Sequence, residues 1–279
     1  MSKKYTAKTL AREVLTFVIT LLFASPFYLL IVNALKTLEE SYANPFGLPS
    51  KINWNSFTEV LNGAGVNANF ANALFNSFVI TAGSLVLLIS LGSLTAYGLS
   101  RHKGKISNLL FAFFVIGIIV PSQLGIVPMY TALRSVDLVG TRLGMILIYL
   151  CKQMPLTVFL YTGFFKRLPI DYEEAAVIDG AGFIKTFTRV VMPQMNAITG
   201  TALLLNSLYI WNDTLDQMVF LSGSKVRTLP VEIYSLTTAM TAKWNLVFAA
   251  VILSLLPMVI LFLFTQKKMM NSLAGGLKG

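Results

Sequence analysis

The sequence predicts an all-α polytopic membrane protein, and three observations carry this prediction. Hydrophobic residues make up 55% of the 279 residues and charged residues only 12%, with a mean hydropathy of +0.70. Ordinary soluble domains contain roughly 25% charged residues. The apolar residues form long runs without strand-like alternation, and backbone groups in lipid must be satisfied within their own segment, which favours helices. We therefore expect a single membrane domain over residues 1–279, a bundle of about six transmembrane helices.

Six apolar runs are long enough to cross a bilayer, since a span requires about 20 residues. In chain order, we expect spans over residues 14–35, 74–99, 109–129, 143–165, 198–221 and 246–265. Pro121 and Pro128 bracket the end of the third span, and proline removes a helical hydrogen bond, so kinks are expected there. Gly83 and Gly92 give the second span a small face that suits close helix packing.

The basic residues predict how these spans are oriented. The N-terminal segment, the loops after the second and fourth spans and the C-terminal segment together hold about twice as many Lys and Arg residues as the opposite side. Cytoplasmic loops carry such an excess, so both termini are expected in the cytoplasm. The net charge of +10 is thereby explained without nucleic acid as a partner. The opposite loop, residues 36–73, contains turn formers and Trp54 and is expected to be a structured cap.

The polar segment 168–193, between the fourth and fifth spans, is the most informative about function. Asp171 and Glu174 have the spacing of a helix N-cap and its partner, which predicts a short helix beginning there. Gly180 and Gly182 are expected to end it, because glycine readily adopts left-handed geometry. A second short helix then follows, and Pro193 separates it from the fifth span. Its apolar stripe consists of Phe183, Ile184, Phe187, Val190 and Val191.

Two interpretations of this hairpin remain open on spacing alone. Small Ala175 and Ala176 would let a partner protein approach closely, with Glu174 and Asp179 available for ion pairs. Alternatively, the hairpin is an amphipathic element that only anchors the chain at the membrane surface.

A family resemblance favours the first interpretation. The run Glu174-Ala175-Ala176-x-x-Asp179-Gly180-Ala181, followed by Met192-Pro193, resembles the EAA loop of ABC-importer permeases. In that family the loop docks into the ATPase subunit, so the resemblance implies a cytoplasmic coupling hairpin. The family usually has Leu before the proline and often a second proline three residues after it, whereas this chain has Met192 and Asn196. The residues that would couple to the ATPase are Glu174, Ala175, Ala176, Asp179, Gly180 and Ala181.

Further pieces of the chain resemble the maltose-type, carbohydrate-importing branch. These are Asn76-Ser77, Ala96-Tyr97 with Arg101, Pro121, Pro128, Trp211-Asn212-Asp213, Thr228-Leu229-Pro230-Val231 and the glycine-rich C-terminal tail. The tail, part of the segment 266–279, is similar to that of the G-type subunit, which reaches between the ATPase subunits. The resemblance implies ATPase contacts for Gly275, Gly276, Lys278 and Gly279.

The same resemblance implies the partners and the location. They are an ABC ATPase dimer that binds ATP and Mg, a homologous second permease subunit and an extracytoplasmic solute-binding protein, in a bacterial or archaeal cell membrane. No cofactor is expected on this chain itself. A sugar or oligosaccharide is the expected cargo, with glycerol phosphate or an amino acid as the alternatives.

Polar residues toward the outer half of the fifth span are candidates for a substrate path. Their amide and carboxylate groups could bind sugar hydroxyls and their aromatic rings could stack on a sugar. Helix–helix hydrogen bonding and an interfacial tryptophan are the preferred interpretation, because the resemblance to the maltose-type branch implies that the partner permease holds most of the sugar contacts. Lys152 in the fourth span must face the bundle or snorkel, because a charge in lipid is costly. The candidate path residues are Asn206, Tyr209, Trp211, Asn212 and Asp213.

A membrane enzyme or a secondary carrier is the competing class. The single histidine, His102, and the single cysteine, Cys151, give no metal-ligand spacing and no catalytic constellation. Asp213 and Asp216 lie on one span, which does not suit a protease with facing aspartates. The sequence contains no G-x-x-x-x-G-K-[ST] run, so ATP is expected to bind to another subunit.

Overall fold

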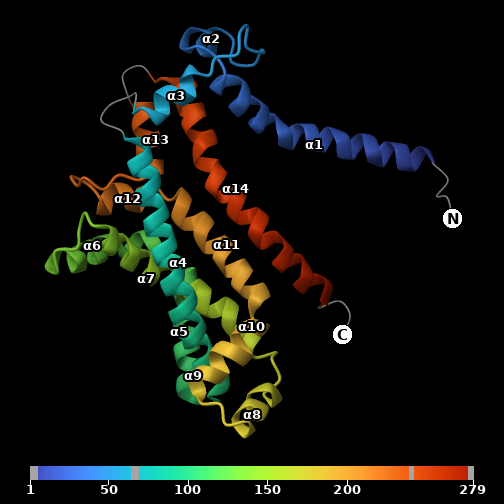
Figure 1. Ribbon diagram of the computed structural model, residues 1–279, viewed down its shortest axis with the longest axis vertical. Helices are drawn as coiled ribbons and strands as arrows, with labels where there is room; N and C mark the ends of the chain where they lie inside the picture. The colour runs from blue at the N-terminus through green and yellow to red at the C-terminus, as the bar shows by residue number, and fades with distance from the viewer. Residues whose placement is uncertain (1–5, 64–68, 239–241, 276–279) are drawn as a thin grey trace. The chain divides into compact units, whose positions relative to one another are not determined.

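A computed structural model describes residues 6–63, 69–238 and 242–275, and all regular structure in these ranges is helical (Figure 1). Within these described ranges, four helices are long and apolar enough to cross a membrane, and a bent pair of shorter helices would make a fifth span. The four are α1 (Ala7–Ala34), α4 (Phe70–Arg101), α7 (Arg142–Phe165) and α14 (Trp244–Gly275). The all-α membrane bundle predicted from the sequence is confirmed, and these helices coincide with the first, second, fourth and sixth expected spans.

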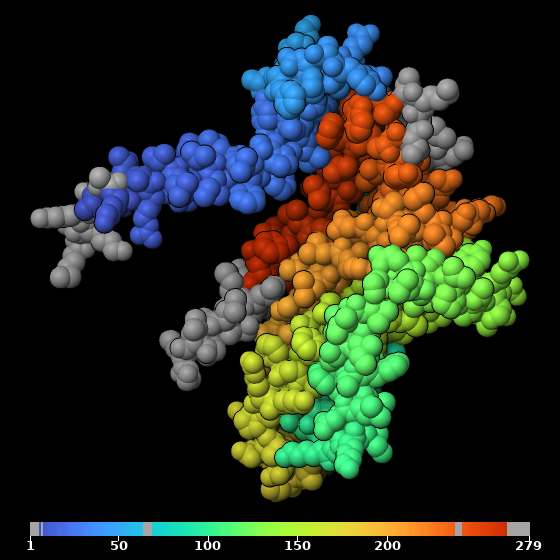
Figure 2. All heavy atoms as spheres, turned by 180° about the vertical axis from the view of Figure 1, so that it is seen from behind, coloured from blue at the N-terminus to red at the C-terminus, as the bar shows by residue number. Residues whose placement is uncertain are grey.

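The third expected span is not one straight helix. Helix α5 (Lys105–Ile119) ends before Pro121, and the chain continues as η1 (Ser122–Gly125) and α6 (Ile126–Ser135) after a bend of 100°. This turn is visible in the green part of both views (Figures 1 and 2). Val120 has φ −68° and ψ 126°, the extended backbone that a following proline imposes. The sequence therefore located the kink but underestimated its size.

The fifth expected span is also interrupted. Helix α11 (Asn196–Asn212) has 17 residues, and Asp213 leaves the helical conformation with φ −69° and ψ 123°. The chain resumes as the short helix α12 (Leu215–Phe220). Hydropathy alone could not show this break, because the interruption is made by polar residues within an otherwise apolar run.

The chain divides into two compact units. The first comprises Met1–Phe70 and Glu232–Leu255, and includes α1, α2 (Leu38–Ala43), α3 (Asn55–Leu61), most of α13 (Leu229–Thr238) and the start of α14. The second comprises Ala71–Val231 and Leu256–Gly279 and includes the remaining helices. The single membrane domain over residues 1–279 stays a prediction.

The loop after α1 is held by side chains that bind backbone carbonyls. Lys36 Nζ donates to the Asn44 carbonyl at 2.6 Å, and Asn33 Nδ2 donates to that of Pro45 at 2.9 Å. Thr37 caps α2 by accepting from the Glu40 amide. These bonds make the described part of this loop a structured cap, as the sequence predicts.

Helix α7 is central to the second unit. It packs against α5, α11 and α12, and its residues Met145, Ile148, Tyr149, Val158, Tyr161 and Phe165 are buried in two hydrophobic clusters. Helix α4 also approaches it closely: a Cβ on Gly92 would lie 2.6 Å from Thr157 Cγ2, and one on Gly83 would lie 2.7 Å from Ile146 Cδ1. The small face expected on the second span is therefore a packing surface.

Candidate functional site

The polar segment after α7 forms a short helix that ends at a left-handed glycine. Helix α8 (Asp171–Ile178) is followed by Gly180 with φ +77°. The amide of Gly180 donates to the Val177 carbonyl and that of Ala181 donates to the Ala176 carbonyl, both at 2.9 Å. This paired closure of a helix C-terminus requires a residue that tolerates positive φ, so Gly180 has the predicted role.

Three local predictions for this segment were wrong. Asp171 is the first helical residue rather than the N-cap, because Ile170 already has helical backbone and its carbonyl accepts from the Glu173 and Glu174 amides. Gly182 has φ −72° and does not supply left-handed geometry; it precedes α9 (Phe183–Thr186). Pro193 lies inside a helical stretch, which continues through the π-helical turn η2 (Phe187–Val191) and α10 (Met192–Gln194) to Met195.

Glu173 holds α8 against the ends of two long helices. Its Oε1 accepts from Arg101 Nε at 2.7 Å and pairs with Arg101 Nη2 at 2.6 Å, and its Oε2 accepts from the Tyr97 hydroxyl at 2.6 Å. The guanidinium also donates to the carbonyls of Phe165, at 2.9 Å, and Leu168, at 3.2 Å. We call the side chains of Tyr97, Arg101 and Glu173 the clamp. Its ion pair is only 15% and 11% exposed, so water competes weakly with these bonds.

Sequence reasoning missed this role of Glu173. Its place in the first turn of α8 explains only a favourable interaction with the helix N-terminus. A signal was available, because Tyr97 and Arg101 are four residues apart at the end of a span and so lie on one helix face. What the sequence could not show is that this face meets α8.

Aromatic packing ties the second short helix to the same place. The Tyr97 ring lies 5.8 Å from the Phe183 ring and 5.2 Å from the Phe187 ring, measured between centroids, and 5.5 Å from that of Phe165. Aromatic pairs at such distances are stabilising. The two short helices are therefore both fixed to α4 rather than attached only through the turn at Gly180.

The outer face of α8 carries most of the residues predicted to couple to an ATPase. Glu174, Ala175, Asp179 and Gly180 are exposed and Ala181 is half-buried, whereas Ala176 is buried. Val177 and Ile178 on the same helix are 64% and 86% exposed. Exposed apolar side chains on a protruding segment are typical of a surface that another protein covers. The coupling role of these residues stays a prediction.

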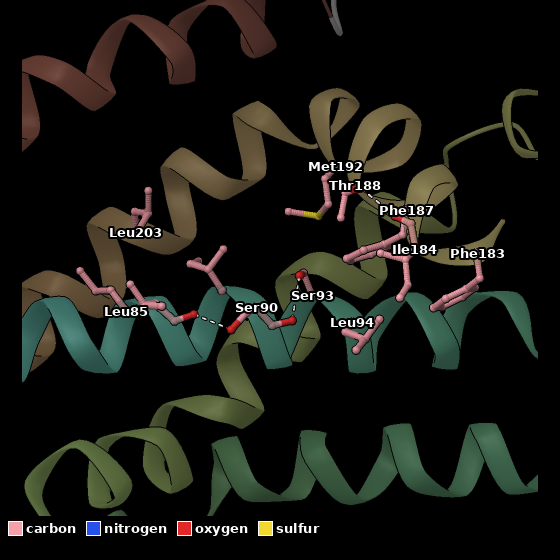
Figure 3. A pocket seen from close by; sticks show the side chains of 12 residues that line it. Leu85, Ser90, Ser93, Leu94, Phe183, Ile184, Phe187, Thr188, Met192 and Leu203 are labelled. Carbon is pink, nitrogen blue, oxygen red and sulfur yellow. Dashed lines mark hydrogen bonds between the residues drawn. The ribbon is translucent and has the colours of Figure 1, made fainter. Parts of the chain in front are cut away.

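An apolar groove lies beside this segment, between α4, α11 and the second short helix (Figure 3). Its volume is about 820 Å³. Its hydroxyl groups are already engaged, since Ser90 donates to the Val86 carbonyl at 2.6 Å and Thr188 donates to that of Ile184 at 2.7 Å. The groove therefore presents hydrocarbon, which suits contact with lipid tails or a membrane helix rather than with a polar cargo.

A second cavity, of about 320 Å³, is polar and lies between η1, α7, α11 and α12. Tyr209, Asn212 and Asp213 line it, so three of the five candidate path residues are brought together. Asn206 is fully buried elsewhere and donates to Thr157 Oγ1 at 3.0 Å, which is helix–helix hydrogen bonding. Trp211 is 4% exposed in the core.

The cavity wall contains a buried ion pair. Lys152 Nζ lies 2.7 Å from Asp216 Oδ1 and 2.6 Å from Asp216 Oδ2, with 2% and 4% of the two side chains exposed. Lys152 therefore faces the bundle, one of its two expected placements. Beside the pair, the Tyr149 hydroxyl donates to Asp213 Oδ2 at 2.8 Å and accepts from Gln217 Nε2 at 2.9 Å. The pairing of Lys152 with Asp216 was not predicted, since the partners are 64 residues apart.

Comparison with known proteins identifies the family. Residues 88–269, well over half of the chain, match the model of the binding-protein-dependent transport system inner membrane component. The chain belongs to this family. It is a multi-pass membrane permease, and the resemblance inferred from the Glu174–Ala181 block is confirmed at the level of the family.

Curated relatives cover almost the whole permease. It is 35% identical over 274 residues to the melibiose/raffinose/stachyose import permease protein MelC of Bacillus subtilis, covering 97% of this chain and 98% of that one. It is 32% identical to the probable starch degradation products transport system permease protein AmyC of Thermoanaerobacterium thermosulfurigenes, covering 95% and 96%. A crystal structure of a bacterial ABC transporter for the acidic polysaccharide alginate matches with a TM-score of 0.82 at 19% identity, covering 95% of this chain and 99% of that one. This last likeness shows the fold.

Proposed function

We propose that this permease forms the membrane passage of an ATP-driven importer that takes up a sugar or oligosaccharide from an extracytoplasmic binding protein. The observation that carries the proposal is the clamp, which joins a surface helix with an exposed outer face to α4 and α7. The names of MelC and AmyC support a carbohydrate cargo, because both names describe the transport of saccharides and both relatives align over nearly the full chain.

In this proposal, ATP is hydrolysed by a separate ATPase dimer that binds α8 on the cytoplasmic side. Closure of the ATPases moves α8, and the clamp passes this movement to α4 through Tyr97 and Arg101 and to the end of α7 through the Phe165 carbonyl. Lys152, on the wall of the polar cavity, lies in the same α7. This continuous connection between the docked helix and the cavity wall suits alternating access by rigid-body movement.

The remaining partners are proposed from the family resemblance. A homologous second permease subunit would complete the passage, and the C-terminal tail would contact the ATPases. Helix α14 extends to Gly275, whereas Gly276, Lys278 and Gly279 lie outside the described residues. The positive-inside distribution of Lys and Arg supports cytoplasmic termini and a cytoplasmic α8.

The test is purification of the permease from its native membrane followed by reconstitution of the companion chains in liposomes. We expect an ATPase, a second permease and a saccharide-binding protein to co-purify, and we expect uptake of labelled raffinose or maltotriose that requires ATP. Uptake by the chain alone, driven by an ion gradient without ATP, would instead identify a secondary carrier and refute the proposal.

A further inference from the structure

Among the described residues that line the polar cavity, acidic side chains outnumber basic ones. Asp213 and Asp216 contribute two carboxylates, and Lys152 contributes one ammonium group. The other lining residues are neutral: Ser122, Gln123, Leu208, Tyr209, Asn212 and Leu215. The cavity is therefore lined by more acidic groups than basic ones, and it has no second cation among the described lining residues.

The ammonium group of Lys152 is not available to a ligand. Both Asp216 carboxylate oxygens lie within hydrogen-bond distance of Nζ, and the side chain is 2% exposed. An ion pair this deeply buried holds its partners firmly, because separating them would leave an unpaired charge out of water. An anionic cargo would have to displace Asp216 to reach the only cation that lines the cavity in the described residues.

The groups that remain available are those that suit hydroxyls. Asp213 is half-buried and accepts from the Tyr149 hydroxyl and from the Asp216 amide, which leaves acceptor positions on its two oxygens. Gln123 and Tyr209 are exposed at the cavity wall and can both donate and accept hydrogen bonds. The Tyr209 ring also offers an apolar face of the kind that packs against a sugar ring.

We infer that this cavity admits neutral saccharides and excludes anionic cargo, and that the Lys152–Asp216 pair sets this selectivity. The inference rests on the proposed function, which it narrows to uncharged sugars. Sugar phosphates, glycerol phosphate and uronates would meet a carboxylate without a free cation. The alginate transporter shares the fold at 19% identity, so the charge of its cargo does not carry over to this permease.

The test measures equilibrium binding to the assembled transporter in nanodiscs without its binding protein, both nucleotide-free and trapped with ATP and vanadate. The probes are two neutral trisaccharides, raffinose and maltotriose, and one anionic trisaccharide, trigalacturonate. For the unmodified transporter we expect at least one neutral probe to bind about tenfold or more tightly than trigalacturonate. Asp216→Asn releases the Lys152 ammonium and should raise relative binding of trigalacturonate by about tenfold.

A matched double variant separates the freed charge from the loss of the carboxylate. Asp216→Asn combined with Lys152→Gln has no ion pair and no free ammonium, so it should not gain trigalacturonate binding. If the transporter with Asp216→Asn does not assemble, the variant Asp213→Asn is used instead. It removes a half-buried carboxylate from the cavity and should therefore weaken the exclusion of trigalacturonate. Two results overturn the inference about charge and leave the proposed function standing. One is equal binding of the neutral and anionic probes by the unmodified transporter. The other is a gain in trigalacturonate binding by the double variant that equals the gain by Asp216→Asn alone. Binding of no saccharide overturns the proposed function as well.

Discussion

Replacing Glu173 by alanine is the sharpest perturbation of the clamp. The change removes the acceptor of the Tyr97 hydroxyl and the ion-pair partner of Arg101, while Arg101 keeps its bonds to the carbonyls of Phe165 and Leu168. The α8 backbone is unaffected in its own hydrogen bonding. The substitution therefore acts mainly on the attachment of α8 to α4, because the small effect of losing a first-turn carboxylate is shared with Glu174→Ala.

The expected cost follows from the burial of the pair. Removing one partner of a buried ion pair costs about 3–5 kcal/mol. The side chains keep 15% and 11% exposure, and Arg101 retains two acceptors, so the lower end applies. A loss of about 3 kcal/mol lowers the ratio of docked to undocked α8 by about 100-fold. Tyr97→Phe removes only one hydrogen bond and should cost about 1 kcal/mol.

The assay compares cargo uptake with ATP hydrolysis in proteoliposomes that contain the companion chains. Glu173→Ala should leave membrane insertion and basal hydrolysis intact and lower the number of sugars taken up per ATP at least severalfold. Limited proteolysis of α8 in membranes should become faster. Glu174→Ala is the matched control for proteolysis, since its side chain is exposed on the same helix.

Two results would refute this reasoning. One is an unchanged uptake-to-hydrolysis ratio in Glu173→Ala protein that is correctly inserted. The other is equal acceleration of proteolysis by Glu173→Ala and Glu174→Ala, which would mean that the clamp does not hold α8.

Three further predictions concern glycines and the tail. Gly180→Ala places a side chain at φ +77°, which should destabilise the folded turn by about 1 kcal/mol and weaken the coupling of ATP hydrolysis to uptake. Gly182→Ala is the control, because a Cβ there also meets open space but φ is −72°, and it should be neutral. Equal losses of uptake in the two variants would contradict this prediction. Gly92→Ala should lower the free energy of unfolding in detergent by about 1–3 kcal/mol, because the new Cβ clashes with α7. Gly98→Ala on the same helix is the control, since its Cβ meets nothing within 4 Å and should leave the melting temperature unchanged. Equal melting temperatures of the two variants would argue against this packing. Deleting residues 275–279 should alter regulation of ATP hydrolysis, and unchanged basal and stimulated rates would reject the proposed role of the tail.

Hydropathy was sufficient to predict four spans, because α1, α4, α7 and α14 are long uninterrupted apolar helices. It failed where local backbone chemistry decided the outcome. The extended conformation of Val120 before Pro121 bends one span by 100°, and Asp213 ends α11 within an apolar run. Hydropathy averages over such single positions and cannot detect them.

The candidate site was predictable in its local parts and not in its contacts. The turn at Gly180 follows from glycine's freedom at positive φ, which is a property of one residue. The clamp and the Lys152–Asp216 pair join residues 64 or more positions apart, and nothing in the spacing of one sequence shows which charges meet. Burial of Lys152 made some partner necessary, but only the packing of α7 against α12 identified it.

The proposed function requires the outer face of α8 to meet an ATP-hydrolysing subunit in the cytoplasm. The most direct measurement is photo-crosslinking in native membranes from a benzoylphenylalanine placed at Ile178, which is 86% exposed. We predict a crosslink to an ATPase chain that strengthens or weakens when ATP is added. Crosslinks only to lipid or to an extracytoplasmic protein would contradict the claim.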